Sequence, residues 1–181
     1  MATPRYALNK NKYLLEPELE KLEQILIHFL KEDERNCLML STALRTGARA
    51  QELLNLRLGD LNAHDQSVFI RGIKGSNDRE IPLQPKFFEQ LHAYALKHEA
   101  TTDSSPVIFA ISYNRLRQIW DQYRPTHKKF HCLRHTFAIR LYKKTKDLRL
   151  VQVALGHRNI TNTMIYADYV YSQTELRRLI L

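Results

Sequence analysis

Apolar residues recur at helical spacing along most of the chain. In the first such stretch, Pro17 opens a pattern whose leucine, isoleucine and phenylalanine positions share one face as far as Phe29. The same spacing predicts eight further helices, at residues 34–45, 50–56, 85–97, 113–123, 133–143, 148–155, 161–169 and 173–181.

Two short segments interrupt this helical pattern. Residues 68–71 and 79–83 have the composition of β-strands, and residues 74–78 between them have that of a turn. We therefore expect a β-hairpin here. The predicted fold is mainly α with a small antiparallel β-sheet, an α+β class.

The first fifteen residues lack the periodic pattern and include three basic residues, Arg5, Lys10 and Lys12. They predict an extended basic arm over residues 1–15. The remaining residues, 16–181, are enough for one domain with a core of its own.

The charge balance indicates the kind of partner. The chain has a formal net charge of +9 and a pI near 9.6, which favours a polyanion, nucleic acid before a membrane surface. A soluble protein that is merely basic remains the alternative. Cys37 and Cys132 are too few for a disulfide framework. Neither a run of the ~18 apolar residues of a membrane span nor a signal peptide is evident, so we expect a cytoplasmic protein at the nucleoid, with no membrane partner.

Histidine and arginine cluster at one predicted helix start. His131, Arg134 and His135 share a helical face, because positions three and four apart lie side by side. Two histidines at this spacing can also bind zinc. However, Cys132 stands where a metalloprotease helix has glutamate, a third ligand is not evident, and the arginine would repel a metal. We therefore favour an anion site without metal, although most single histidines are structural.

Two glycines mark further candidate positions. Gly156 ends an apolar helix and presents His157 at a turn, where side chains meet ligands. Gly47 ends an earlier helix, so that Arg49 falls at the start of the next one, a good geometry for binding phosphate. Glu52, one turn further along, could orient the Arg49 guanidinium. A surface Arg–Glu pair is the plainer interpretation.

Lys74 stands in the predicted hairpin turn. A lysine there is usually solvated. It could also enter a DNA groove and protonate a leaving oxygen.

Taken in order, these positions resemble the tyrosine recombinase (phage integrase) family. The resemblance spans roughly residues 16–170 and includes a tyrosine, Tyr166, separated from His157 by eight residues. It implies the catalytic-domain fold of that family. The family's usual N-terminal core-binding domain does not precede the first helix, so we expect either an excised catalytic domain or a small single-domain member.

The resemblance implies a reaction and a role for each residue. Such enzymes are site-specific recombinases that cleave and rejoin DNA strands through a 3′-phosphotyrosyl intermediate, without metal, ATP or other cofactor. The implied roles are phosphate binding by Arg49 and Arg134, proton transfer and hydrogen bonding by His131, a hydrogen bond from His157, general acid catalysis by Lys74, and nucleophilic attack by Tyr166. Gly47, Glu52 and His135 would support the site, His135 as a structural neighbour.

Further expectations concern Tyr166 and assembly. The neighbouring cations should favour its phenolate, and Thr161 should cap its helix. Tyr169 and Tyr171 are rival nucleophiles. The family also implies double-stranded DNA as partner and self-association into a dimer or tetramer on DNA. The helix at residues 173–181 would dock either on a neighbouring copy or on its own domain.

Other functions with related chemistry remain open: a type IB topoisomerase, a telomere resolvase, or a DNA-binding regulator on a degenerate recombinase scaffold. Target sequence and biological role (integration, excision, inversion or resolution) depend on base contacts, which phosphate-binding motifs do not encode.

Overall fold

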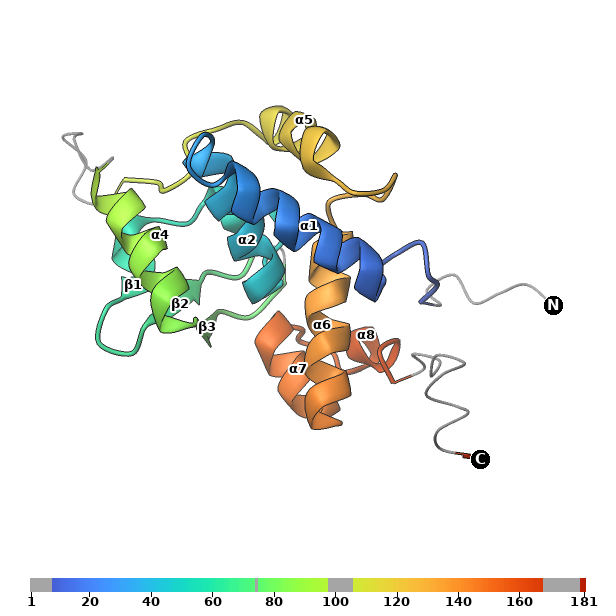
Figure 1. Cartoon of the computed structure of the whole chain (residues 1–181). Helices are drawn as coiled ribbons and strands as arrows, with labels where there is room; N and C mark the ends of the chain where they lie inside the picture. The colour runs from blue at the N-terminus through green and yellow to red at the C-terminus, as the bar shows by residue number, and fades with distance from the viewer. Residues whose placement is uncertain (1–7, 74, 98–105, 168–179) are drawn as a thin grey trace.

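The computed structural model describes residues 8–73, 75–97, 106–167 and 180–181. The predicted fold class is confirmed: helices predominate, and the strands form one small antiparallel sheet (Figure 1). Within the described residues, no helix has the length and apolar character needed to cross a membrane.

The core forms around helix α2 (Glu34–Thr46), most of which is buried. Helix α1 (Glu16–Phe29) packs along it through the apolar face predicted from the sequence, which includes Leu22. The chain joins this core before residue 16, because Tyr13 and Leu14 are already buried. The Tyr13 carbonyl accepts a hydrogen bond from Lys128 Nζ at 2.8 Å.

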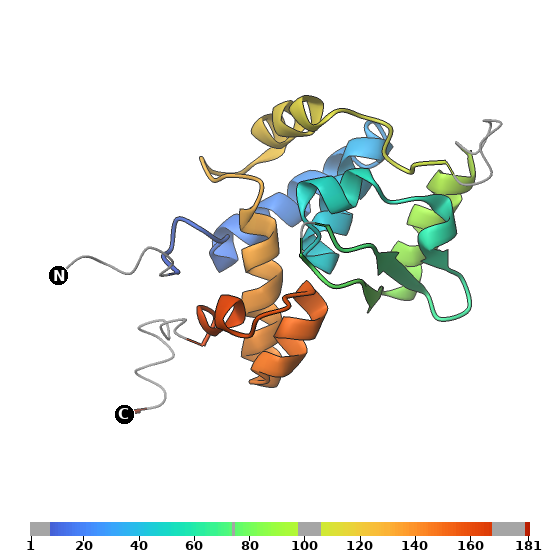
Figure 2. The same cartoon turned by 180° about the vertical axis from the view of Figure 1, so that it is seen from behind.

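The sheet contains three strands in the order β1 (Leu61–Asn62), β2 (Ser67–Ile70) and β3 (Arg79–Pro82). The predicted hairpin is β2–β3, paired antiparallel. The sequence did not predict β1 or the 3₁₀ turn before it, Leu58–Asp60, because both are too short to show a period. Helix α4 (Pro85–Lys97) lies against one face of the sheet, as the view from behind in Figure 2 also shows.

Helix α6 (Cys132–Thr145) links the N-terminal helices to the C-terminal ones. It packs on α2 and on α7 (Leu148–Leu155), while α5 (Tyr113–Tyr123) packs on α1 and on the short α3 (Ala50–Leu54) (Figure 1).

The last described helix, α8 (Thr161–Met164), is shorter than the predicted 161–169. It begins after Ile160 rather than after a Thr161 cap, which corrects that expectation. The Asn159 side chain accepts the Thr161 N–H at 2.9 Å instead. Most of the predicted helix at 173–181 lies outside the described residues, as do the rival nucleophiles Tyr169 and Tyr171.

Two substitutions on α1 test this packing. Leu22 has no exposed surface and Ile27 is 74% exposed, although both are large apolar residues on one helix. Leu22→Ala should lower the free energy of unfolding by about 2–5 kcal/mol, because it removes buried contacts and leaves a cavity. Ile27→Ala should change it by less than about 1 kcal/mol. Urea denaturation measures both, and equal losses would contradict the described packing of α1.

Candidate functional site

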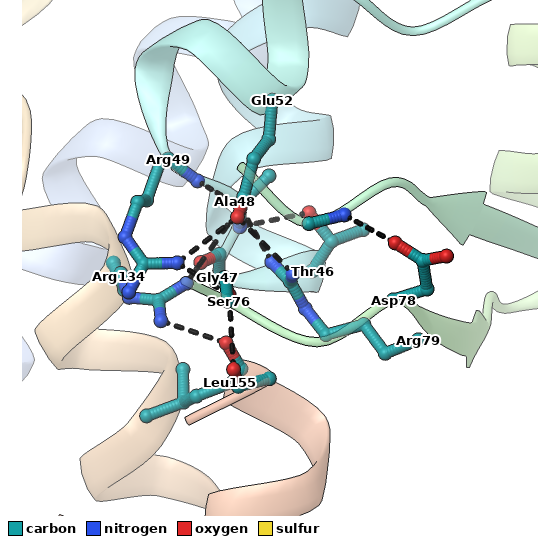
Figure 3. Close-up of polar contacts among 12 residues, drawn as sticks. Thr46, Gly47, Ala48, Arg49, Glu52, Ser76, Asp78, Arg79, Arg134 and Leu155 are labelled. Carbon is teal, nitrogen blue, oxygen red and sulfur yellow. Dashed lines mark hydrogen bonds and ion pairs between the residues drawn. The ribbon is translucent and has the colours of Figure 1, made fainter. Parts of the chain in front are cut away.

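Three arginines surround one buried carboxylate, that of Glu52. Glu52 Oε1 lies 3.0 Å from Arg49 Nη1, and Glu52 Oε2 lies 2.7 Å from Arg79 Nη2 and 3.9 Å from Arg134 Nη1 (Figure 3). The Arg49 backbone N–H also donates to Oε2, at 2.8 Å. Burial by itself would raise the pKa of the Glu52 carboxyl. The hydrogen bonds and charges of the arginines outweigh burial and hold the pKa below its usual value.

Arg134 is held by two helix ends. Its Nη1 donates to the Gly47 carbonyl at 2.6 Å, and its Nη2 donates to the Leu155 carbonyl at 2.8 Å (Figure 3). Gly47 ends α2 at φ +62°, as predicted, and a Cβ there would come within 2.5 Å of Phe137 Cδ1. Burial, and then the charge of the other arginines, lowers the pKa of Arg134 to about 9, so the guanidinium is still charged at neutral pH.

Arg49 is the arginine that solvent reaches, since its side chain is 32% exposed. Its Nη1 also donates to Ser76 Oγ at 2.8 Å. Ser76 Oγ in turn donates to the Gly156 carbonyl at 2.9 Å, and the Asn77 N–H donates to the same carbonyl at 2.8 Å. Ser76 therefore joins the hairpin, the α2–α3 turn and the end of α7. Lys74, the expected general acid, lies outside the described residues.

The three candidate histidines are neutral at neutral pH. Burial, followed by neighbouring positive charges, lowers the pKa of His131 to about 4, of His135 to about 3 and of His157 to about 4. His131 immediately precedes α6 and still reaches solvent. Its ring meets the His135 ring edge-on, with the two ring centroids 4.8 Å apart. His157 follows the predicted left-handed cap at Gly156 (φ +68°) and shares a hydrogen bond of 2.9 Å with Thr163 Oγ1.

Tyr166 follows α8 and is only 1% exposed. Its Oη lies 2.9 Å from His135 Nδ1. Burial raises the pKa of Tyr166 to about 12, because it outweighs the favourable charges of Arg134 and Arg49. The nearby cations favour the phenolate, as expected, but the net shift of the Tyr166 pKa is upward. The arginines are near enough to act, but loss of hydration has the larger effect.

The phage integrase family model matches residues 12–173. The chain belongs to the phage integrase family. It is 29% identical to the tyrosine recombinase XerA of Pyrococcus furiosus over 178 residues, which are 92% of this chain and 60% of the relative. It is 33% identical to a tyrosine recombinase of Pseudothermotoga lettingae over 170 residues, 87% of this chain and 56% of the relative. The chain thus spans less than two thirds of these relatives.

Solved structures of integrase-family proteins share the fold. The XerH recombinase in a post-cleavage complex with palindromic difH substrate aligns with a TM-score of 0.76 at 27% identity, over 95% of this chain and 54% of that one. The XerA recombinase aligns with a TM-score of 0.72 at 25% identity, over 97% of this chain and 65% of that one.

The structure brings the described candidate residues of this integrase-family chain into one site. Gly47, Arg49, Glu52 and Arg134 share a hydrogen-bond network, and the charge of Arg134 acts on His131, His135, His157 and Tyr166. In the described part of the chain, no three His, Cys, Asp or Glu side chains are grouped so that they could hold a metal ion.

Sequence reasoning missed three residues of the network: Arg79, Ser76 and Thr163. Arg79 had a detectable signal. Because side chains alternate along a strand, Arg79 faces the same side as Ile81 and Leu83, and a charge on that inward side needs a buried partner. Ser76 and Thr163 carried no comparable signal, since hydroxyl residues are common in turns and at helix ends.

The lowered histidine pKa values predict how stability depends on pH. Between about pH 4 and pH 6.5 the unfolded chain binds more protons at these histidines than the folded chain does, so the free energy of unfolding should fall as the pH is lowered through this range. Glu52, with its lowered pKa, acts in the same direction at lower pH. Urea denaturation at a series of pH values checks this. His157→Asn should reduce the slope, whereas substitution of His64, whose side chain is 93% exposed, should leave it unchanged. A wild-type stability that does not fall would contradict the lowered pKa values of these rings.

Proposed function

We propose that this chain is the catalytic part of a site-specific DNA recombinase, which cleaves and rejoins strands through Tyr166. The observation that carries the proposal is the network on Glu52. Three guanidinium groups surround one carboxylate, which leaves an excess of two positive charges. A phosphodiester carries one negative charge, and the transition state of attack on its phosphorus carries a second. The network therefore favours the transition state over the bound substrate.

The exposure of the arginines suggests how phosphate binds. Arg49 is part-exposed, and Glu52 and Ser76 orient its guanidinium. It would bind one non-bridging oxygen, and Arg134, fixed by two carbonyls and 2% exposed, would stabilise the other through its charge. His131 and His157 would donate hydrogen bonds to the phosphate, and His131 would assist proton transfer.

The proposed chemistry balances without a metal ion or ATP. Tyr166 Oη forms a bond to phosphorus and passes its proton to His131, while the bond from phosphorus to the 5′-oxygen breaks and Lys74 protonates that oxygen. In the 3′-phosphotyrosyl link, the phosphoester bond to the 5′-oxygen is replaced by a phosphoester bond to Tyr166 Oη. The reverse attack by a 5′-hydroxyl can therefore rejoin strands.

The proposed partner is double-stranded DNA. It is supported by the net charge of +9 and by the similarity to XerH, whose structures contain difH substrate. Self-association on DNA is part of the same proposal. A contribution of residues 173–181 to it stays a prediction, as do the basic arm at 1–15 and the domain at 16–181.

A trapped-cleavage experiment tests the nucleophile. DNA containing a candidate site, nicked so that the cleaved end diffuses away, should give a denaturation-resistant protein–DNA adduct. Tyr166→Phe should bind the DNA and give no adduct, whereas Tyr113→Phe, at a residue 51% exposed on α5, should behave as wild type. An adduct that persists in Tyr166→Phe would disprove the nucleophile. Binding without an adduct on any DNA would favour the regulator.

The same assay on other DNAs separates the remaining enzymes. Relaxation of supercoiled DNA that lacks a defined site would favour a type IB topoisomerase, and hairpin-ended products would favour a telomere resolvase. Strand exchange restricted to one sequence is the result that we expect.

A lysine substitution tests the arginine geometry. Arg49→Lys keeps the charge and loses the planar fork, so adduct formation should slow by about 100-fold or more. Arg45→Lys is the matched control, because the Arg45 guanidinium lies over the Phe87 ring at 4.5 Å and is not part of the Glu52 network. A DNA linkage with a neutral methyl group in place of a non-bridging oxygen should reduce the defect of Arg49→Lys. Equal rates for both lysine variants would contradict the phosphate-binding role.

A further inference from the structure

Two histidines hold the chain around Tyr166. His157 Nδ1 shares a hydrogen bond with Thr163 Oγ1 inside α8, and His135 Nδ1 shares one with Tyr166 Oη just after it, each at 2.9 Å. Both rings come from outside α8, His135 from α6 and His157 from the turn after α7. The position of Tyr166 thus depends on contacts with two other elements.

In this position Tyr166 cannot reach a phosphate. Its ring packs in a small apolar cluster that includes Tyr13, Ala138 and Leu155, and only 1% of the residue is exposed. A nucleophile must come within about 3–3.5 Å of the atom that it attacks. The DNA backbone is too large to enter this cluster. The phenol must therefore move outward before it can act.

We propose that His135 is a positioning residue that keeps Tyr166 in this buried resting position through the Nδ1–Oη hydrogen bond, and that this bond breaks when the tyrosine moves to the phosphate. The significance of the movement rests on the proposed role of Tyr166 as the nucleophile. The hydrogen bond itself can be tested without DNA.

The placement of His135 on α6 supports this role. The preceding residue, Arg134, bonds to the Gly47 and Leu155 carbonyls and carries part of the positive charge of the site. Successive residues of one helix turn therefore contact the proposed phosphate site and the proposed nucleophile. Among the described residues, His135 supplies the hydrogen-bond partner of Tyr166 Oη. The His135 ring also meets the His131 ring edge-on.

Acetylation of tyrosine by N-acetylimidazole, read by peptide mass spectrometry, tests the proposal on the whole chain. His135→Phe keeps an aromatic ring and loses the hydrogen bond, so Tyr166 should be acetylated about 2- to 10-fold faster, as loss of one hydrogen bond allows. His135→Asn places a polar atom near the position of Nδ1 and should restore the wild-type rate. Tyr113, already exposed on α5, is the internal reference. His92→Phe is the matched control, because the His92 ring stacks on Phe88 in α4.

A Tyr166 acetylation rate in folded His135→Phe equal to that of wild type would overturn the proposal. Failure of His135→Asn to restore the rate would also overturn it, since loss of packing would then explain the change. If His135→Phe does not fold, nitrogen NMR of the histidine rings decides. The His135 Nδ1 signal should shift in Tyr166→Phe, and an unshifted signal would overturn the proposal.

The adduct assay separates this inference from the proposed function. With wild-type protein, absence of an adduct on any DNA would overturn the proposed function, while the acetylation rates would still decide whether His135 holds Tyr166. With an adduct present, His135→Phe should form it at a different rate from wild type, and His135→Asn should form it at the wild-type rate. An unchanged rate in His135→Phe would contradict the need to break this bond.

Discussion

The Glu52 carboxylate is buried, and guanidinium groups reach it from the start of α3, from β3 and from α6. A buried carboxylate is costly unless nearly all of its hydrogen-bonding capacity is used. Here Arg49 and Arg79 use both oxygens, and the three segments must keep their relative positions for the contacts to persist. The same contacts that make burial of Glu52 tolerable therefore fix the geometry of the arginines.

Helix ends add a second constraint. The Gly47 carbonyl at the end of α2 and the Leu155 carbonyl at the end of α7 both accept hydrogen bonds from Arg134. The C-terminus of a helix carries partial negative charge, which stabilises a cation placed there. The glycines Gly47 and Gly156 turn the chain directly after these helices and so leave the carbonyls available to one guanidinium. Arg134 is thus held by two backbone carbonyls in addition to its ion pair with Glu52.

Much of this arrangement could be predicted because it is local. Helical spacing gave α1 and α2, turn composition gave the β2–β3 hairpin, and the glycine caps followed from their position after apolar helices. The resemblance to the phage integrase family joined Arg49 to Arg134, which are far apart in sequence. A pattern within one segment could not have done so.

What could not be predicted depends on contacts between distant segments. The Ser76 hydroxyl bonds to Gly156, eighty residues away, and nothing in the turn containing Ser76 indicates that partner. The raised pKa of Tyr166 could not be predicted for the same reason. The sequence suggests which charges lie near a tyrosine, but only the packing of Tyr13 and Leu155 around it shows how much water it has lost.

The charges of the site and the burial of Tyr166 together imply an order of events in the proposed reaction. Without an anion, burial and then the charge of the arginines lower the pKa of His131 and His157, and burial keeps the phenol protonated. A phosphate bound beside Arg49 and Arg134 would offset part of this positive charge and raise the pKa of His131 and His157, so that a larger fraction of each ring would be protonated. A hydrogen bond from His157 to that phosphate would compete with its bond to Thr163 and so loosen α8. Phosphate binding would thus precede release of Tyr166, because His157, a proposed phosphate ligand, also bonds to Thr163 in α8.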